Sequence, residues 1–184
     1  MNSQYLKTLV LLLPTMGVAM FSSAVYATEC TGVTVDVCFR PGTISCETKI
    51  VDAINGAQSS LDVQAYSFTA VPIIQAIGNA KKRGVDVRVV LDRENQQKRY
   101  TGATYLTNAD VPVRIDDTVA IAHNKVMVID SSLTIGGSYN YTASAEKKNA
   151  ENVTFMSGSC VADQYRMNFE KRWKVARPFS GKQL

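Results

Sequence analysis

The residues that could do chemistry together lie in one stretch of the chain, Ile121–Asn140. It holds His123, the only histidine of the protein, and Lys125 two positions later. The first part of this stretch has a pattern typical of a β-strand, in which side chains two positions apart share a face, so His123 and Lys125 should project to the same side. The pattern predicts a potential nucleophile or base beside a fixed positive charge. Phosphoryl transfer needs such a pair, because negative charge builds up on the phosphate oxygens as the bond breaks.

The same stretch carries a longer pattern, His-x-Lys-x4-Asp-x6-Gly-Ser-x-Asn. Its positions are filled by His123, Lys125, Asp130, Gly137, Ser138 and Asn140. In these residues the sequence resembles the HKD motif of the phospholipase D superfamily. The length of the chain, its hydrophobic start and the single copy of the motif further resemble the small exported bacterial endonucleases of that superfamily.

The resemblance implies a mechanism with two histidines. One attacks phosphorus to form a phosphohistidine, and the other protonates the leaving oxygen and then activates the water that clears the intermediate. This chain has one motif and one histidine, His123. The second histidine must therefore come from another copy, and we expect a homodimer with one shared active site.

The remaining motif residues receive roles from their chemistry and from the match. Lys125 and Asn140 are expected to donate to the phosphate oxygens, and Ser138 to bind phosphate or orient a neighbour. Glu151 is expected behind His123, where it would accept the proton of the second ring nitrogen. The motif places Asp130 among the catalytic residues, but strand parity puts it on the opposite face, which favours a structural role at the turn. No metal or cofactor is expected, because lysine supplies the positive charge, and activity should survive a chelator.

The N-terminal segment has the features of a signal peptide. A short polar start with one lysine precedes an apolar run from Leu9 to Phe21, and Val25–Ala27 offers small residues to a signal peptidase. We therefore expect a signal peptide at residues 1–27 and a phospholipase D-like nuclease domain at 28–184. The alternative is an uncleaved anchor. The mature protein should be periplasmic or secreted, without stable membrane association.

The cysteine count is even in a protein expected to be exported, which predicts two disulfides. Three cysteines lie close together and one lies far away: Cys30, Cys38, Cys46 and Cys160. One bridge should therefore be local, and the other should tie the N-terminal segment to the region of Cys160. Three pairings remain possible, and buried free thiols are the alternative. The absence of a Cys-x-x-Cys spacing disfavours a zinc site.

Alternating strand and helix patterns predict how the motif is positioned. Strands are expected at Thr31–Phe39, Leu61–Phe68, Val85–Leu91, Val111–Ile115, His123–Ile129, Leu133–Gly136 and Glu151–Met156, and helices at Cys46–Ala57, Val71–Arg83 and Cys160–Val175. A polar loop with a short helix is expected at Asp92–Tyr105. This order predicts βαβ crossovers in one α/β domain, with a mixed, largely parallel central sheet flanked by helices on both faces.

These features together predict a metal-independent, non-specific endonuclease that hydrolyses nucleic-acid phosphodiester bonds. The formal net charge is +4, and +3 without the expected signal peptide, which is compatible with a polyanionic substrate but not diagnostic of one. One alternative is a phospholipase D-type lipid phosphodiesterase, since the same site could do that chemistry. Another is a catalytically silent nucleic-acid-binding protein. The sequence leaves open whether DNA or RNA is the substrate.

Overall fold

The computed structural model describes residues 29–96 and 101–181, so the expected signal peptide lies outside the described residues. The strands are β1 (Thr34–Arg40), β2 (Ser60–Ala65), β3 (Asp86–Asp92), β4 (Val113–Asp116), β5 (Lys125–Ile129), β6 (Leu133–Gly137), β7 (Glu151–Ser157) and β8 (Arg177–Pro178). The helices are α1 (Cys46–Gly56), α2 (Val71–Lys82), α3 (Gly102–Asn108), α4 (Ala143–Lys147) and α5 (Ser159–Val175), with a short 3₁₀ turn η1 (Arg93–Gln96). Each strand and long helix expected from the sequence is present, with small shifts at the ends.

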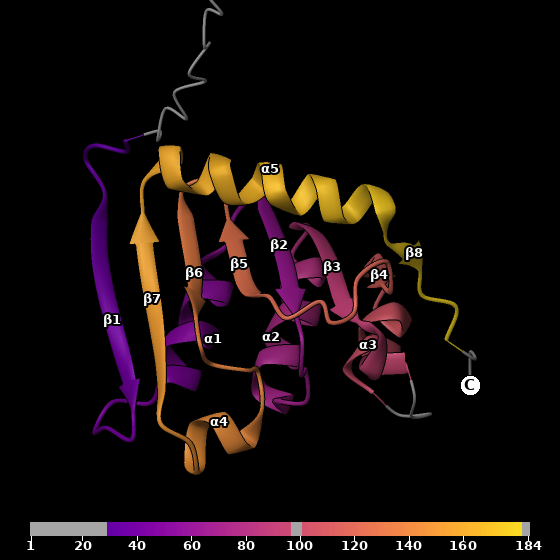
Figure 1. Cartoon of the computed structure of the whole chain (residues 1–184), viewed down its shortest axis with the longest axis horizontal. Helices are drawn as coiled ribbons and strands as arrows, with labels where there is room; N and C mark the ends of the chain where they lie inside the picture. Colours follow the sequence, from indigo (N-terminus) through magenta and orange to yellow (C-terminus); the bar gives the residue numbers. More distant parts are fainter. Residues whose placement is uncertain (1–28, 97–100, 182–184) are drawn as a thin grey trace, which may run out of the picture.

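All eight strands form one sheet in the order β1-β7-β6-β5-β2-β3-β4-β8 (Figure 1). The sheet is mixed, as expected, but the expectation that it is largely parallel was wrong. Only β2-β3 and β3-β4 pair in parallel, and the other five neighbouring pairs are antiparallel. The reason is the length of the connections. Helical crossovers join β2 to β3 and β3 to β4, whereas a tight turn joins β5 to β6, and a tight turn can join only antiparallel strands.

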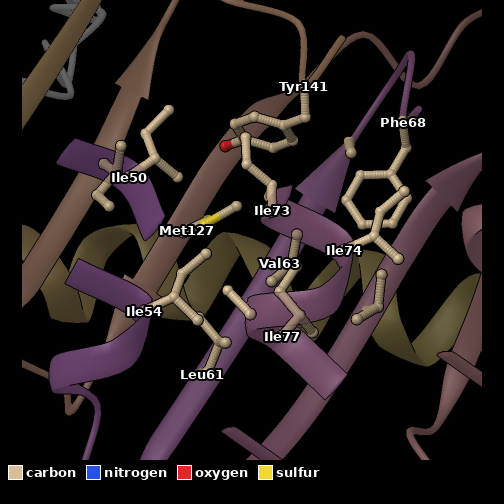
Figure 2. Close-up of a cluster of buried hydrophobic side chains, with 14 of the residues drawn as sticks. Ile50, Ile54, Leu61, Val63, Phe68, Ile73, Ile74, Ile77, Met127 and Tyr141 are labelled. Carbon is tan, nitrogen blue, oxygen red and sulfur yellow. The ribbon is translucent and has the colours of Figure 1, made fainter. Parts of the chain in front are cut away.

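Helices cover both faces of the sheet. α1, α2 and α3 lie on one face, and α5 crosses the strands on the other (Figure 1). The main core lies under α1 and α2, where Ile50, Ile54, Ile73 and Ile77 pack with Leu61, Val63 and Met127 (Figure 2). Under α5 the core is small and consists of Val90, Phe169 and Ala176 with Trp173 beside them. The single α/β domain is therefore held mainly by the first helical layer.

Local sequence signals explain where the helices begin. Ser45 caps α1 by accepting a hydrogen bond from the backbone of Thr48, and Pro72 occupies the first turn of α2. In α5 the ring of the buried Phe169 stacks on Trp173 at 5.8 Å between centroids. No helix in the described part of the chain is long and apolar enough to cross a bilayer.

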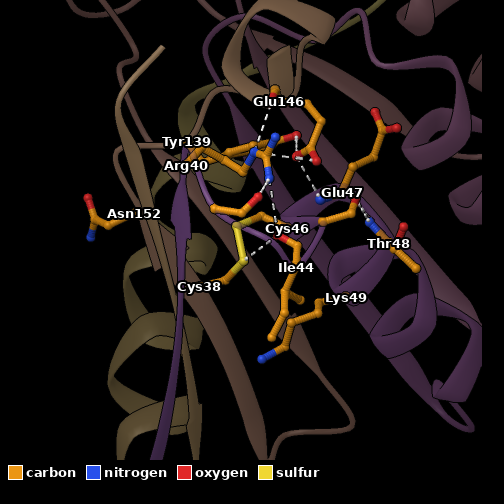
Figure 3. The surroundings of a disulfide bond; sticks show 12 residues. Cys38, Arg40, Ile44, Cys46, Glu47, Thr48, Lys49, Tyr139, Glu146 and Asn152 are labelled. Carbon is orange, nitrogen blue, oxygen red and sulfur yellow. Dashed lines mark hydrogen bonds and ion pairs between the residues drawn. A yellow bond between two sulfur atoms is a disulfide. The ribbon is translucent and has the colours of Figure 1, made fainter. Parts of the chain in front are cut away.

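Two disulfides close the N-terminal region, and both follow the expected division into one local and one distant bridge. Cys38 pairs with Cys46 and joins the end of β1 to the start of α1 (Figure 3). Cys30 pairs with Cys160 and joins the segment before β1 to the first turn of α5, across 130 residues of sequence. The alternative of free thiols is excluded for these four residues.

Candidate active site

The motif residues gather at one edge of the sheet. β2, β3 and β6 end there, and β5 and β7 begin there, because Lys125 pairs with Ala65 and Gly137 pairs with Val153 (lower edge in Figure 1). The edge therefore receives His123 and Lys125 from the start of β5, Ser138 and Asn140 from the turn after β6, and Glu151 from the start of β7. Five of the six predicted site residues are brought to this edge.

His123 lies just before β5 and not within it, which corrects the expected start of the strand. Its backbone is fixed from three sides. Ala122 N donates to Asp92 Oδ2 at 2.7 Å, Tyr66 N donates to Asn124 O at 3.0 Å, and Lys125 Nζ donates to His123 O at 2.9 Å. The imidazole itself is exposed and packs on the Tyr66 ring, with 4.6 Å between centroids. Within the described residues it makes no hydrogen bond, so a ring nitrogen is available to a substrate.

Lys125 begins β5 and is buried, with 7% of its surface exposed. Burial lowers the pKa of its ammonium group, and the nearby carboxylate of Glu151 opposes that shift. The ammonium lies 5.3 Å from the centroid of the Tyr66 ring, so the same tyrosine contacts both motif side chains. A partly desolvated positive charge interacts more strongly with a phosphate than the same charge in water.

The turn after β6 has a backbone that requires glycine. Gly137 has a φ of +145°, and a Cβ at this position would lie 2.2 Å from Asn152 O. The close approach lets Ser138 meet the start of β7, where its Oγ accepts from Asn152 N at 3.0 Å and donates to Glu151 Oε2. Asn140 Oδ1 is buried and has no hydrogen-bond partner among the described residues. The Asn140 amide is therefore not committed to the fold.

The hydrogen-bond partners of Glu151 differ from the expected one, His123. Its carboxylate accepts from Ser138 Oγ and, at 2.8 Å, from Asn149 Nδ2. Among the described residues it makes no hydrogen bond to His123, whose ring packs on Tyr66. The predicted role of Glu151 in setting the histidine tautomer stays a prediction.

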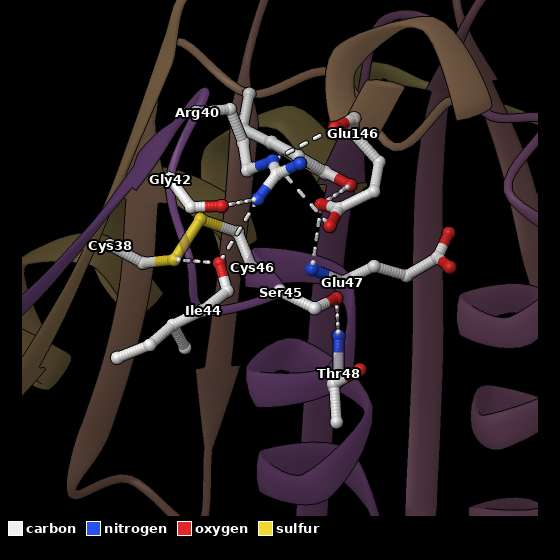
Figure 4. A network of polar contacts seen from close by, with 10 residues as sticks. Cys38, Arg40, Gly42, Ile44, Ser45, Cys46, Glu47, Thr48 and Glu146 are labelled. Atoms are coloured by element: carbon white, nitrogen blue, oxygen red, sulfur yellow. Dashed lines mark hydrogen bonds and ion pairs between the residues drawn. A yellow bond between two sulfur atoms is a disulfide. The ribbon is translucent and has the colours of Figure 1, made fainter.

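A polar network holds the turn of the motif from behind. Tyr139 donates to Glu146 Oε2 at 3.1 Å (Figure 3). The backbone N–H of Glu47, in the first turn of α1, donates to the same oxygen at 3.1 Å (Figure 4). Arg40 Nε donates to Glu146 O at 2.8 Å. Burial and the neighbouring Glu146 carboxylate raise the pKa of Tyr139. The network ties α4, β1 and α1 to the residue between Ser138 and Asn140.

Asp130 lies at the opposite end of β5, about 16 Å along the strand from Lys125 at the usual rise per residue. Its carboxylate accepts from Ser59 N, Ser60 N and Gln58 N at 2.7, 3.0 and 2.9 Å, and from Ser59 Oγ at 2.9 Å. These hydrogen bonds lower its pKa, although burial opposes them. The structural role favoured for Asp130 matches this geometry, and the chain does not bring Asp130 to the site edge.

Sequence reasoning missed three residues of the site edge: Tyr66, Asp92 and Glu94. Tyr66 contacts His123 and Lys125, and Asp92 anchors the backbone before His123. A usable signal existed, because Tyr66 directly follows β2 and Asp92 ends β3. Polar residues at the carboxyl ends of parallel strands commonly line ligand sites.

The described residues contain no group of three or more His, Cys, Asp or Glu side chains arranged to hold a metal ion. The chemistry of this edge comes from one imidazole, one buried ammonium, one amide and one hydroxyl–carboxylate pair. Such a set can attack a phosphodiester and balance the charge that develops on its oxygens.

Comparison with known proteins defines the class. Residues 50–173 match the family described as "Cardiolipin synthase, PLD-like domain". A "Phospholipase D" of Rickettsia conorii is 40% identical over 138 residues, which are 75% of this chain and 68% of that protein. The chain belongs to the phospholipase D superfamily and is a phosphodiesterase of that superfamily.

Solved structures agree in fold. The crystal structure of a phospholipase D family member, Nuc from Salmonella typhimurium, superposes with a TM-score of 0.75 and 34% identity, over 80% of this chain and 98% of that one. NucT from Helicobacter pylori superposes with a TM-score of 0.72 over 80% of this chain and 99% of that one, at 20% identity. The described domain thus matches nearly the whole length of both structures.

Proposed function

We propose that this protein is a metal-independent, non-specific endonuclease that cuts nucleic-acid phosphodiester bonds through a phosphohistidine, with one active site shared by a homodimer. One observation carries the proposal. The exposed imidazole of His123 makes no hydrogen bond within the described chain and lies beside the buried ammonium of Lys125. The single histidine of the sequence is the reason for the second copy.

The proposed reaction has two displacements at phosphorus. An imidazole nitrogen of His123 attacks, a nitrogen–phosphorus bond forms, and the bond to the leaving oxygen breaks as the partner subunit's His123 gives that oxygen a proton. The partner subunit's His123 then takes a proton from water, whose oxygen displaces the histidine and releases a phosphate monoester. Lys125 and Asn140 stabilise the charge on the non-bridging oxygens. Ser138 orients Glu151, to which it donates a hydrogen bond.

Three observations support a nucleic acid over a lipid as substrate. The chain resembles the small exported endonucleases, its net charge is positive, and the match to the Nuc structure covers 80% of this chain and 98% of that one. The second candidate, a lipid phosphodiesterase, is favoured by the name of the Rickettsia conorii relative. Two disulfides in the described chain support export to the periplasm or beyond. A cleaved signal peptide at residues 1–27 is part of the same proposal.

The test is cleavage of plasmid DNA in excess EDTA by the wild type, His123→Ala and Lys125→Ala. We expect the wild type to cut and each substitution to lower the rate by about 10³-fold or more, as for residues that act as one catalytic unit. Loss of wild-type cutting in EDTA would contradict the metal-free mechanism. Intact DNA together with hydrolysis of a phospholipid would establish the second candidate instead.

A further inference from the structure

A cavity of about 660 Å³ opens beside the candidate active site. It lies between the segment after β2, the start of α2, and α3. Its lining includes Tyr66, Phe68, Val71, Glu94, Asn95 and Tyr105. The proposed mechanism does not use this cavity.

The cavity and the catalytic histidine share a wall. Tyr66 lines the cavity and packs on the His123 ring at 4.6 Å between centroids. Asn95 holds the backbone of Tyr66 in place, because its side-chain amide donates to Tyr66 O at 2.6 Å. The cavity is therefore adjacent to the ring of the proposed nucleophile.

The walls are aromatic and rigid. Tyr66, Phe68 and Tyr105 supply three rings, and Phe68 is fully buried. α3 begins tightly against the floor, since a Cβ at Gly102 would lie 2.7 Å from the Phe68 ring. Tyr105 packs closely against α2, where a Cβ at Gly78 would lie 3.1 Å from its ring. Flat, preformed aromatic walls favour a flat ligand.

The polar groups of the cavity discriminate among ligands. The described lining residues include no lysine or arginine. The carboxylate of Glu94 accepts from Tyr66 OH at 3.0 Å and retains further acceptor capacity. The carboxylate acceptor and the aromatic walls suit a flat group that carries N–H donors, which describes a nucleobase.

We propose that this cavity binds the unstacked base of the nucleotide next to the scissile phosphate, which makes single-stranded nucleic acid the preferred substrate. The inference rests on the proposed nuclease function. Ligand cavities of about 300–1,000 Å³ hold molecules of drug size, so the volume suits a nucleoside unit and far exceeds a small headgroup such as choline. A base in a duplex is stacked and paired, and must be extruded before it can enter.

The test compares two single strands of equal length, one with normal bases and one with abasic sites throughout, in excess EDTA. We expect the wild type to cut the base-bearing strand about ten-fold faster or more, as one stacked base allows, and to cut its duplex more slowly. Tyr105→Ala, which removes a wall, and Val71→Trp, which fills the exposed mouth at the start of α2, should each abolish this preference. Both should leave the rate on the abasic strand unchanged. Tyr165→Ala in α5, on the other face of the sheet, is the matched control and should keep the preference.

Equal wild-type rates on the two single strands would overturn the base site while leaving the nuclease intact. Retention of the preference by both Tyr105→Ala and Val71→Trp, with native circular dichroism, would likewise overturn it. If the wild type cut neither strand and released choline from phosphatidylcholine vesicles, both the nuclease function and the base site would be wrong, and the cavity would serve a lipid.

Discussion

The ammonium group of Lys125 lies largely out of water, and its pKa is lowered by that burial. A cation whose pKa is lower in the folded than in the unfolded state binds its proton less well when folded. The charged form of Lys125 therefore destabilises the fold at any pH below its pKa in the folded state. This destabilisation disappears as the pH rises to the pKa of the unfolded state, near 10.5. The residue that the chemistry needs is thus unfavourable for stability.

Lys125→Met tests this conflict. We expect the free energy of unfolding at pH 7 to stay the same or rise, while cleavage falls by about 10³-fold. Any gain in the free energy of unfolding of Lys125→Met over the wild type should shrink as the pH is raised from 9 to 11, measured by urea titration. Lys82→Met, at an exposed position in α2, is the control and should change neither quantity. A large loss of stability on replacing Lys125 would show that its charge supports the fold.

Asp130 shows the opposite relation between charge and stability. Backbone and side-chain donors from Gln58 to Ser60 lower its pKa, so its charge stabilises the fold above the unfolded pKa near 3.8, and this is lost as the pH falls through the lower folded value. Asp130 is also the first residue of the turn between β5 and β6, in which Asp130 and Ser131 both have positive φ. A structural reason for an aspartate at this motif position is that it binds the β5–β6 hairpin to the start of β2.

Asp130→Ala should therefore act on stability more than on catalysis. We expect it to lower the free energy of unfolding by about 2 kcal/mol at pH 7, as for lost hydrogen bonds to a charged group. The difference from the wild type should narrow below pH 4 in urea titrations. The rate of the folded variant should stay within several-fold of the wild type. A folded Asp130→Ala protein as inactive as His123→Ala would contradict this assignment.

Spacing alone predicted that His123, Lys125 and Ser138 lie near one another, because the pattern lies in one hairpin and the turn after it. Their catalytic roles stay predictions. The spacing of the motif did not include Tyr66 or Asp92, which reach the His123 segment from the carboxyl ends of β2 and β3. Nor could it predict the partner of Glu151, since strand parity gives a face but not which side chain lies opposite. Local patterns determine local geometry, and long-range contacts need the fold.

At the scale of elements, periodicity predicted the strands and helices but not the sheet order. The apolar alternation of Val35 and Val37 marked β1 correctly, yet these side chains are exposed at 58% and 47%, because β1 is an edge strand beyond the reach of α5. An alternating pattern predicts a strand, but it does not predict which element packs on each face of that strand. The share of parallel pairing was overestimated for a different reason, the short connection between β5 and β6, which allows only antiparallel pairing.

The two disulfides constrain elements over very different lengths, and this predicts unequal contributions. Cys38 and Cys46 are 8 residues apart, and Cys30 and Cys160 are 130 apart. Chain-entropy arguments give about 2.5 kcal/mol for a loop of the first length and about 5 kcal/mol for the second. We expect Cys30→Ser/Cys160→Ser to lower the urea midpoint more than Cys38→Ser/Cys46→Ser.

The Cys38–Cys46 disulfide also lies near the candidate active site, which distinguishes it from the Cys30–Cys160 disulfide. It lies beside the network in which Arg40 and Glu146 hold Tyr139 (Figure 3). Loss of this bridge should therefore raise the KM for DNA several-fold, through the turn that carries Ser138 and Asn140. Loss of the distant bridge at the first turn of α5 should leave KM unchanged when the protein is folded. A larger stability loss for the local pair would contradict the loop-length argument.

At the scale of the whole molecule, the chain supplies half of the proposed chemistry. Its one described domain matches nearly the full length of the Nuc structure and carries one histidine, one buried lysine and one uncommitted asparagine amide. The carboxylate of Glu151 does not reach the histidine of its own chain. Each of these facts agrees with a site completed by a two-fold related copy, in which the same groups act twice.

Subunit mixing tests the shared site directly. Wild type and His123→Ala are combined at constant total concentration, unfolded in urea with disulfides intact, and refolded together. If cleavage needs both histidines of a dimer, activity follows the square of the wild-type fraction, and an equal mixture keeps about a quarter of the full rate. Independent chains would keep about half. The control mixes wild type with Lys82→Met, which should retain the full rate at every ratio. A linear fall with His123→Ala would mean that one histidine suffices, and water or another group of the same chain would then have to protonate the leaving oxygen.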